Sequence, residues 1–194
     1  MKLIVASNNQ HKIEEIKKIL EKLDMDVLSL KDAGIDIEVV EDGETFEENA
    51  YKKAKEVFDI VTDAYVLADD TGLMVDAING APGVYSARFS GEGATYEKNN
   101  KKLLDLLKNT GDKERGAKFV CVMVLIMSKD KVIKVRGEAA GRILHEAKGK
   151  NGFGYDPLFY VEEYGKTFAE MTNEEKNSIS HRGRALEKLR EALK

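Results

Sequence analysis

Two adjacent carboxylates, Asp69 and Asp70, directly follow the apolar residues 64–68. Such a run predicts a buried strand, and we expect the acids at its carboxyl end, where ligand crevices open in α/β sheets. Because successive strand residues point to opposite faces, Asp70 is predicted to face a metal ion while Asp69 orients a loop. Mg²⁺ takes one or two carboxylates plus water and phosphate oxygens, and Glu41 is the predicted second ligand because it ends another apolar strand. The alternative interpretation is a pair of solvated turn acids.

A polar turn, SNNQHK (residues 7–12), connects an apolar segment to a helical pattern near the start of the chain. A helix that begins there aims free backbone N–H groups and the positive end of its dipole at one point, where Lys12 adds a full charge. The turn is therefore a predicted phosphate site, although it lacks the glycines of a Walker loop. In the alternative interpretation, Ser7, Asn8 and Asn9 only cap the helix.

The segment KGKNGFGYDP (residues 148–157) places glycines around Phe153, Tyr155 and Asp156. Glycines let the backbone approach a ligand closely, and an aromatic ring can stack on a base. The segment therefore indicates a contact with a nucleoside. The competing explanation is a tight structural loop with buried aromatic residues.

Cationic side chains surround a serine-rich break before the last predicted helix, in the segment KNSISHRGRA. Lys176, His181 and Arg182 lie there, and positive charge at the start of a helix opposes the helix dipole. This placement indicates a bound anion or carbonyl, and solvated surface charge is the alternative. Lys53, on the polar side of an earlier helix with Asn49, is a further candidate, although a lysine on a wet helix face usually has no such role.

Alternating strand and helix signals determine where these candidates lie. Strands are predicted at residues 3–6, 27–30, 35–40, 64–68, 119–127, 132–137 and 158–161. Two helices are predicted from their apolar spacing: one after residue 12, with Ile13, Ile16, Leu20 and Leu23 inward, and one after Thr95, with Leu103, Leu104 and Leu107 inward. Two more are predicted from capping boxes: one begins at Thr45 and Glu48 and runs to about Val61, and one begins at Thr172 and Glu175 and runs to Leu193. The turn at Lys129 and Asp130 predicts an antiparallel hairpin, which argues against an all-parallel sheet. We therefore predict an α/β fold with a mixed sheet.

Composition restricts the class of partner. The 194 residues carry a formal net charge of −4, which removes the general attraction to phosphate backbones that nucleic-acid-binding domains have, so an anionic ligand must be held by a local basic pocket. The single cysteine, Cys121, lies inside the apolar run FVCVMVLIM and is predicted to be a core residue in a reducing compartment. That run and the N-terminus are too short for a membrane span or a signal peptide. We expect a cytoplasmic protein that binds neither nucleic acid nor membrane.

Several longer motifs occur in a characteristic order: SNNQHK, GETFEENAYKKA, ADDTGL, NGAPGVYSARF, GFGYDPLF, TFAEMT and EEKNSISHRGRA. Together they closely resemble the Ham1-like inosine/xanthosine triphosphate pyrophosphatases, over residues 2 to about 189. The resemblance implies a single domain over residues 1–194, with an elongated mixed α/β fold of two lobes, a cleft between them, and a homodimer. It also implies hydrolysis of deaminated purine nucleoside triphosphates to monophosphate and pyrophosphate, with Mg²⁺ as cofactor.

The resemblance also assigns roles to individual residues of this chain. Glu41 and Asp70 would bind the metal, and Asp70 would accept the proton from the attacking water. The residues that would contact the substrate are Ser7, Asn8, Asn9, Gln10, His11, Lys12, Lys53, Thr71, Phe153, Gly154, Tyr155, Asp156, Lys176, His181 and Arg182. Two positions depart from the family pattern, because Thr71 stands where serine is common and Asn8 stands where glycine is frequent.

Two other classes of function remain open at this stage. A nucleotide-sensing module without catalysis would use the same basic residues, but it would not need Glu41, Asp69 and Asp70 to converge. A metal-dependent phosphomonoesterase would use the acids but release orthophosphate instead of pyrophosphate. The identity of the released phosphate therefore separates the three.

Overall fold

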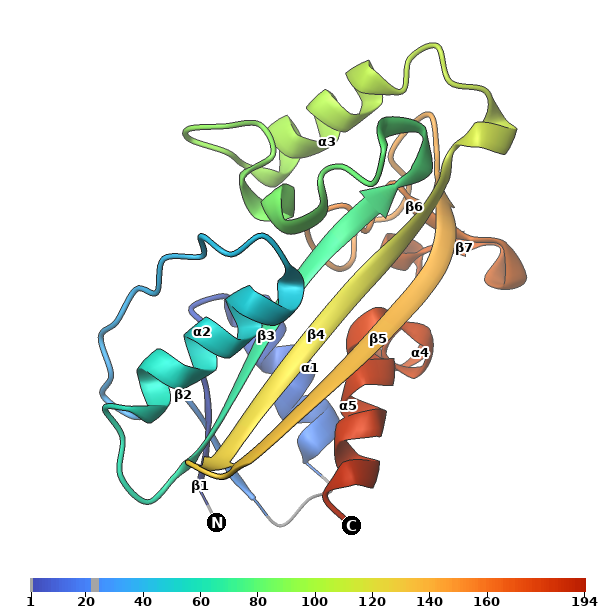
Figure 1. Ribbon diagram of the computed structural model, residues 1–194. Coiled ribbons are helices and arrows are strands. Elements are labelled where there is room, and N and C mark those ends of the chain that lie inside the picture. Colours follow the sequence, from blue (N-terminus) through green and yellow to red (C-terminus); the bar gives the residue numbers. More distant parts are fainter. Residues whose placement is uncertain (1, 22–24) are drawn as a thin grey trace. The chain divides into compact units, whose positions relative to one another are not determined.

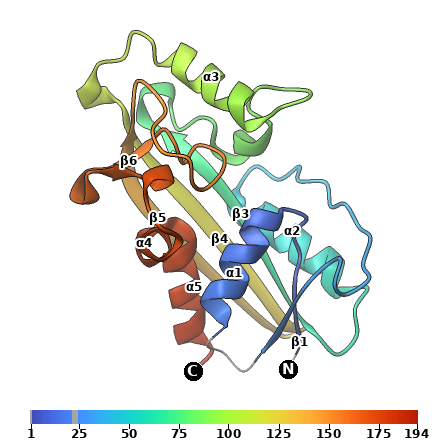
Figure 2. The same ribbon diagram turned by 180° about the vertical axis from the view of Figure 1, so that it is seen from behind.

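A computed structural model of the chain describes residues 2–21 and 25–194 (Figure 1; Figure 2 shows the reverse side). Within these residues, seven strands form one sheet in the order β2-β1-β3-β4-β5-β6-β7. The strands are β1 (Lys2–Val5), β2 (Asp26–Ser29), β3 (Tyr65–Val75), β4 (Gly116–Ser128), β5 (Lys131–Ile143), β6 (Phe159–Val161) and β7 (Lys166–Thr167). The α-helices are α1 (Gln10–Leu20), α2 (Phe46–Phe58), α3 (Tyr96–Leu106), α4 (Asn173–Ile179) and α5 (His181–Ala192). Short 3-10 helices are η1 (Asp76–Ile78), η2 (Gly83–Arg88), η3 (Asp112–Glu114), η4 (Glu162–Tyr164) and η5 (Phe168–Glu170).

The sheet contains both strand orientations. β1 pairs in parallel with β2 and with β3, whereas β6 pairs antiparallel with β5 and with β7. β4 and β5 are joined by a turn at Lys129 and Asp130, a connection short enough only for antiparallel neighbours. The predicted α/β fold with a mixed sheet is confirmed.

The chain divides into two compact units. The first comprises residues 1–70, 121–137 and 182–194, and the second comprises residues 71–120 and 138–181. Because the unit boundaries fall inside β3, β4 and β5, each of these strands contributes residues to both units. The single domain over residues 1–194 stays a prediction.

In the first unit, alternate residues of the strands pack against different helices. Leu67 of β3 belongs to a core with Ile16 of α1 and Leu186 of α5. Its neighbour Val66 points to the other face of the sheet, because strand side chains alternate. In the two views, α1 and α5 cover one face of this part of the sheet and α2 covers the other (Figures 1 and 2). The face of the sheet to which a β3 side chain points therefore decides which helices that side chain contacts.

The second unit has its own core, rich in aromatic residues. Phe119, Phe159 and Phe168 are buried together, with ring centroids 4.7 to 5.8 Å apart. Arg115 is almost fully buried and donates hydrogen bonds to backbone carbonyls, among them Leu107 O at 2.7 Å and Leu144 O at 2.8 Å. These hydrogen bonds connect the end of α3 to the end of β5, so the Arg115 side chain has a structural role.

Several predicted elements are confirmed with shifted boundaries. α2 begins at the predicted Thr45 and Glu48 capping box but ends at Phe58 instead of about Val61. α3 begins after Thr95, whose side chain accepts from the Lys98 amide, and buries Leu103 and Leu107, while Leu104 is partly buried. Leu23, predicted on the first helix, lies outside the described residues.

Two predictions about elements are wrong. Residues 35–40 lie outside every strand in the described part of the chain, and Val40 is 66% exposed, so their apolar alternation reflects an extended segment without a pairing strand. The predicted C-terminal helix is two helices, because extended backbone at Ser180 (φ −69°, ψ 158°) ends α4 before α5 begins. The serine-rich break predicted before the last helix lies at this point.

Cys121 is buried in the core of the first unit, as predicted. A search of the helices in residues 2–21 and 25–194 finds none with the length and apolar character that a membrane crossing requires.

Candidate functional site

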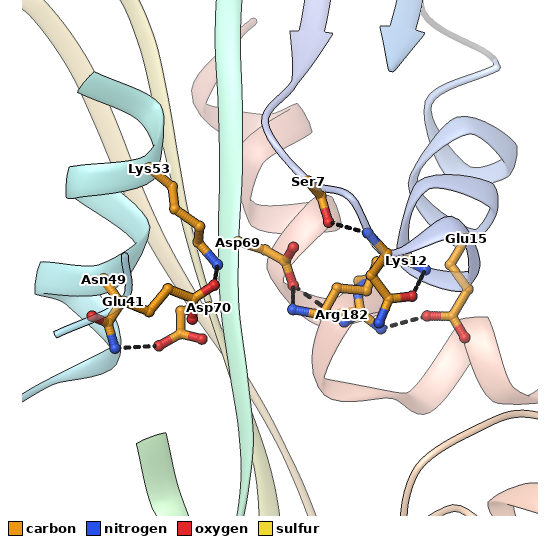
Figure 3. Close-up of polar contacts among 10 residues, drawn as sticks. Ser7, Lys12, Glu15, Glu41, Asn49, Lys53, Asp69, Asp70 and Arg182 are labelled. Carbon is orange, nitrogen blue, oxygen red and sulfur yellow. Dashed lines mark hydrogen bonds and ion pairs between the residues drawn. The ribbon is translucent and has the colours of Figure 1, made fainter. Parts of the chain in front are cut away.

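The acidic pair lies inside β3, not at its end. β3 continues from Tyr65 through Asp69 and Asp70 to Val75, whereas the sequence predicted that the strand stops at the acids. That prediction is wrong because backbone pairing in the sheet, which composition does not reveal, extends the strand through polar residues. The predicted alternation is confirmed: Figure 3 shows Asp69 on the side of Lys12 and Arg182, and Asp70 on the side of Asn49.

Asp69 shares the face of Leu67 and is held by two cations. Its Oδ2 lies 3.1 Å from Lys12 Nζ and 3.2 Å from Arg182 Nη2. Arg182 also pairs with Glu15 of α1, and the side chains of Asp69 and Arg182 are 0% and 1% exposed. Burial lowers the pKa of Arg182, but the charges of Asp69 and Glu15 outweigh burial and raise that pKa overall. Asp69 therefore connects α1, β3 and α5 through ion pairs, and its predicted role in orienting a loop stays a prediction.

Asp70 faces α2 on the opposite side of the strand. Its Oδ2 accepts a hydrogen bond of 3.0 Å from Asn49 Nδ2. Four residues further along α2, Lys53 donates to Glu41 Oε1 at 2.9 Å. Residues four apart lie on the same helix face, so α2 presents Asn49 and Lys53 together to the two acids that were predicted to bind metal. Figure 3 shows these four side chains on one side of β3.

Burial and neighbouring charges shift the pKa values of Asp70 and Lys53 in this cluster. Desolvation raises the pKa of Asp70, Glu41 raises it further, and Lys53 and Lys12 only partly offset these effects. Burial lowers the pKa of Lys53, but Asp69, Glu41 and Asp70 outweigh burial, so that pKa lies above its ordinary value. The arrangement therefore combines a charged lysine with a carboxylate whose proton affinity is increased.

The predicted phosphate turn forms an ordered cap at the start of α1. Asn9 is the N-cap and its side chain accepts from the Lys12 amide at 3.2 Å, while Ser7 Oγ accepts from the Asn9 amide at 3.2 Å. The Asn8 side chain donates to Ile37 O at 3.3 Å. Asn9 thus caps the helix as that interpretation predicts, and phosphate binding by the turn stays a prediction.

Gln10 and His11 form the first turn of α1, and their side chains are exposed. Gln10 donates to Glu14 Oε1 at 3.2 Å along the helix.

In the second unit, the predicted glycine-rich loop is held by a buried ion pair. Asp156 Oδ2 lies 2.7 Å from Lys176 Nζ, with both side chains 4% exposed, and it also accepts from the Phe153 amide at 2.9 Å. Lys176 Nζ lies 4.8 Å from the centroid of the Phe153 ring. Gly152 has a φ of +73°, and a Cβ there would lie 2.1 Å from Asp156 Oδ2, so only glycine fits.

The other predicted contacts of this unit differ in exposure. Tyr155 is buried and donates its hydroxyl to Ser86 O at 2.8 Å, and burial raises the pKa of this phenol. His181 is buried and stacks on Phe119, with centroids 4.6 Å apart. For Tyr155 the structural interpretation of the loop is therefore confirmed, whereas Phe153 is only partly buried.

The predicted residues are thus divided between the two units. The first unit contains Ser7, Asn8, Asn9, Gln10, His11, Lys12, Glu41, Lys53, Asp70 and Arg182, and the second contains Thr71, Phe153, Gly154, Tyr155, Asp156, Lys176 and His181. Arg182 was predicted to start a helix as an anion-binding cation, and its guanidinium pairs with two carboxylates of the first unit. Contact of any of these residues with substrate stays a prediction.

Sequence reasoning missed the contributions of Glu15 and Asn49. Glu15 lies on α1 and pairs with Arg182, 167 positions away, a relation without any local signature. The spacing of Asn49 and Lys53 on one face of a predicted helix was a usable signal for a shared site.

The chain is similar in sequence and in fold to known proteins. A profile of the Ham1 family matches residues 3–192. A dITP/XTP pyrophosphatase of Clostridium perfringens is 57% identical, with 100% of this chain and 97% of the relative covered, and one of Clostridium tetani is 53% identical over 99% and 96%. The solved Ham1 protein of Staphylococcus aureus has a TM-score of 0.87 at 41% identity, and that of Coxiella burnetii has 0.89 at 39%; each comparison covers 100% of this chain and 98% of the other.

Proposed function

Because this chain belongs to the Ham1 family, we propose that it hydrolyses deaminated purine nucleoside triphosphates, dITP or ITP and dXTP or XTP, to the monophosphate and pyrophosphate. Full-length relatives named dITP/XTP pyrophosphatase support the substrate class. The observation that carries the chemistry is the buried cluster in which Asp70 and Glu41 lie with Lys53 on the α2 side of β3.

Asp70 is the proposed proton acceptor. The oxygen of a water molecule attacks the α-phosphorus, the bond from that phosphorus to the oxygen bridging to the β-phosphorus breaks, and pyrophosphate leaves. The proton of the water passes to Asp70, a buried carboxylate on the α2 side of β3. Lys12 and Lys53 neutralise the charge on the departing pyrophosphate.

Mg²⁺ is the proposed cofactor, with Glu41 and Asp70 as the residues that would hold it. Two features support the fit: carboxylate oxygens are the donors that Mg²⁺ prefers, and Glu41 raises the pKa of Asp70, a repulsion that a divalent cation relieves. Among residues 2–21 and 25–194, no three His, Cys, Asp or Glu side chains are grouped as a metal site, which leaves the other coordination positions to water and phosphate oxygens. When bound, the ion supplies positive charge that polarises phosphate oxygens.

The released phosphate tests this function against the alternatives. Purified protein is incubated with dITP and Mg²⁺, and pyrophosphate and orthophosphate are measured separately. We expect pyrophosphate that disappears with a chelator, and a loss of about 10² to 10⁴ in rate for Asp70→Asn. Orthophosphate alone would instead identify a phosphomonoesterase, and binding without either product would identify a nucleotide-sensing module.

Substrate class is tested in the same assay with dATP as the control. Hypoxanthine and xanthine carry a keto oxygen at the position where adenine carries an amino group, so a single hydrogen-bond donor aimed at that position rejects adenine. We expect dATP to be hydrolysed much more slowly than dITP. Equal turnover of the two would contradict the proposed substrate class.

We also propose that the protein is a cytoplasmic homodimer, because the family resemblance implies a homodimer and nucleotide pools are cytoplasmic. Sedimentation equilibrium is expected to return twice the mass of the chain. The mass of a single chain at micromolar concentration would contradict the dimer.

A further inference from the structure

Asn49 connects Asp70 to the backbone two residues after Glu41 through opposite ends of its side-chain amide. It is fully buried, at 0% exposure. Its Nδ2 donates to Asp70 Oδ2 at 3.0 Å, and its Oδ1 accepts from the Gly43 backbone amide at 2.8 Å. Gly43 is two residues from Glu41, so one amide contacts Asp70 and the backbone that carries Glu41.

The orientation of this amide is determined by its partners. A backbone N–H can only donate, so the atom of Asn49 that faces Gly43 must be the oxygen. The NH₂ group therefore faces Asp70, and an ionised carboxylate is an acceptor that strengthens such a bond. Both ends of the amide are satisfied, so its rotamer cannot flip without losing two hydrogen bonds.

The close approach at Gly43 restricts the site further. A Cβ on Gly43 would lie 2.7 Å from Asn49 Oδ1 and 2.8 Å from Glu48 Cβ, so no other residue fits without a shift. The contact is also anchored at the start of α2, because the Thr45 and Glu48 capping box lies directly before Asn49. The backbone at residue 43 is thus fixed from both sides.

We propose that Asn49 is a positioning residue that fixes one oxygen of Asp70 and the backbone near Glu41, and so holds these two carboxylates in a constant relation to each other. Its catalytic consequence rests on the proposed function, since Asp70 is the proposed proton acceptor. A misplaced acceptor slows the chemical step more than it weakens substrate binding, because the substrate's other contacts remain.

The chain offers a closely matched control in α3. Asn99 follows its cap residue Thr95 at the same spacing as Asn49 follows Thr45, and it is also buried. Its Oδ1 accepts from the Ser90 amide at 2.8 Å, and its Nδ2 donates to Ala87 O at 3.0 Å. The two asparagines therefore differ in one respect that matters here: the NH₂ group of Asn99 meets backbone carbonyls and that of Asn49 meets a carboxylate.

Asn49→Asp and Asn99→Asp are compared at a temperature well below both unfolding midpoints. Each variant keeps the acceptor for its backbone amide and loses the donor, so both are expected to unfold at lower temperature than the wild type. We expect kcat for dITP to fall about tenfold or more in Asn49→Asp, with KM changed less than about threefold, and kcat to stay within about twofold in Asn99→Asp. Equal losses of kcat in the two variants, or an unchanged kcat in Asn49→Asp, would overturn the proposal.

A second measurement does not depend on activity or on the stability of either asparagine variant. In ¹⁵N-labelled wild-type protein, the side-chain NH₂ protons of Asn49 are expected to exchange slowly with solvent, and this protection should be lost in Asp70→Ala while that of Asn99 is unchanged. Unaltered protection of Asn49 in Asp70→Ala would overturn the contact. If the wild type released no pyrophosphate, the proposed function would be wrong. The exchange measurement would still show whether Asn49 donates a hydrogen bond to Asp70.

Discussion

Asp69 and Asp70 are adjacent in sequence, yet they have opposite electrostatic surroundings. Asp69 meets Lys12 and Arg182 at 3.1 and 3.2 Å and is fully buried. Asp70 receives one hydrogen bond from Asn49, and burial and Glu41 make its ionised form less favourable. The surroundings of Asp69 therefore favour its ionised form and those of Asp70 disfavour it, so the same substitution should have opposite effects on stability at the two positions.

Asp69→Asn is expected to destabilise the protein strongly. The change removes a carboxylate that pairs with the buried Arg182 and with Lys12, and breaking a buried ion pair typically costs about 3 to 5 kcal/mol. Urea unfolding of the variant and the wild type measures the loss. A change of less than about 1 kcal/mol would show that these ion pairs do not stabilise the fold.

Asp70→Asn is expected to be more stable than the wild type at neutral pH without divalent metal. The folded-state pKa of Asp70 is raised, so the folded protein keeps this proton to a higher pH than the unfolded chain does. Stability therefore falls as the pH rises from the unfolded to the folded pKa, and it stays lower above that window. Asparagine does not ionise and escapes this decline, while its side-chain oxygen can still accept from Asn49.

Urea unfolding between about pH 4 and pH 8 checks this difference. The gain of Asp70→Asn should shrink as the pH falls toward the ordinary pKa of aspartate. A variant less stable than the wild type at pH 7 would contradict the expected sign. Asp69→Asn, measured beside it, removes the same charge from the same strand but should be less stable than the wild type.

At the scale of elements, α2 connects the core to the candidate site. Ala54 and Val57 are fully buried on its core face, and Asn49 and Lys53 reach Asp70 and Glu41. The capping box at the start of the helix comprises Thr45 and Glu48, and Asn49 is the next residue after Glu48. Fraying of the first turn of α2 would therefore disturb Asp70 and Glu41 directly, whereas α3 contacts the glycine-rich loop of the second unit.

Thr45→Ala and Thr95→Ala test this difference between two helices with the same cap. Each change removes a side-chain acceptor for a backbone amide and is expected to cost about 0.5 to 2 kcal/mol, measured by urea unfolding. Thr45→Ala should also lower kcat for dITP, and by more than Thr95→Ala does, because the first turn of α2 carries Asn49, which contacts Asp70. Equal kcat values in the two variants would show that the first turn of α2 does not position the site.

At the scale of the whole molecule, charge distribution decides which anions bind. The net charge of −4 opposes the approach of a polyanion, so an anionic ligand depends on local cations such as Lys12 and Lys53, which lie beside acids. Short-range attraction of this kind suits a small triphosphate. A nucleic acid needs an extended basic surface instead.

Duplex DNA in excess over dITP is therefore expected to leave the rate of pyrophosphate release unchanged. A polymer without an extended basic surface to bind gains little from counterion release and does not compete for the site. The assay is run at low and at moderate salt, with free Mg²⁺ kept constant. Inhibition that weakens as salt rises would reveal a nucleic-acid surface and contradict this prediction.

The sequence by itself determined the elements with local signatures and the family. The capping boxes at Thr45 and Thr172, the apolar run of β4 and the two-residue turn after it were all predicted, because caps, turns and apolar runs depend on neighbouring residues. The opposite directions of Asp69 and Asp70 followed from strand geometry alone.

Only the tertiary structure decided what the two acids meet. β3 runs through them because strand pairing, not composition, decides where a strand ends. Asp69 pairs with Arg182, 113 positions away, and Asp70 bonds to Asn49, 21 positions away. The physical reason is that hydrogen bonds and ion pairs act over short distances in space. A buried carboxylate binds the donor that the fold brings within about 3 Å, and a local sequence pattern does not indicate which distant segment supplies that donor.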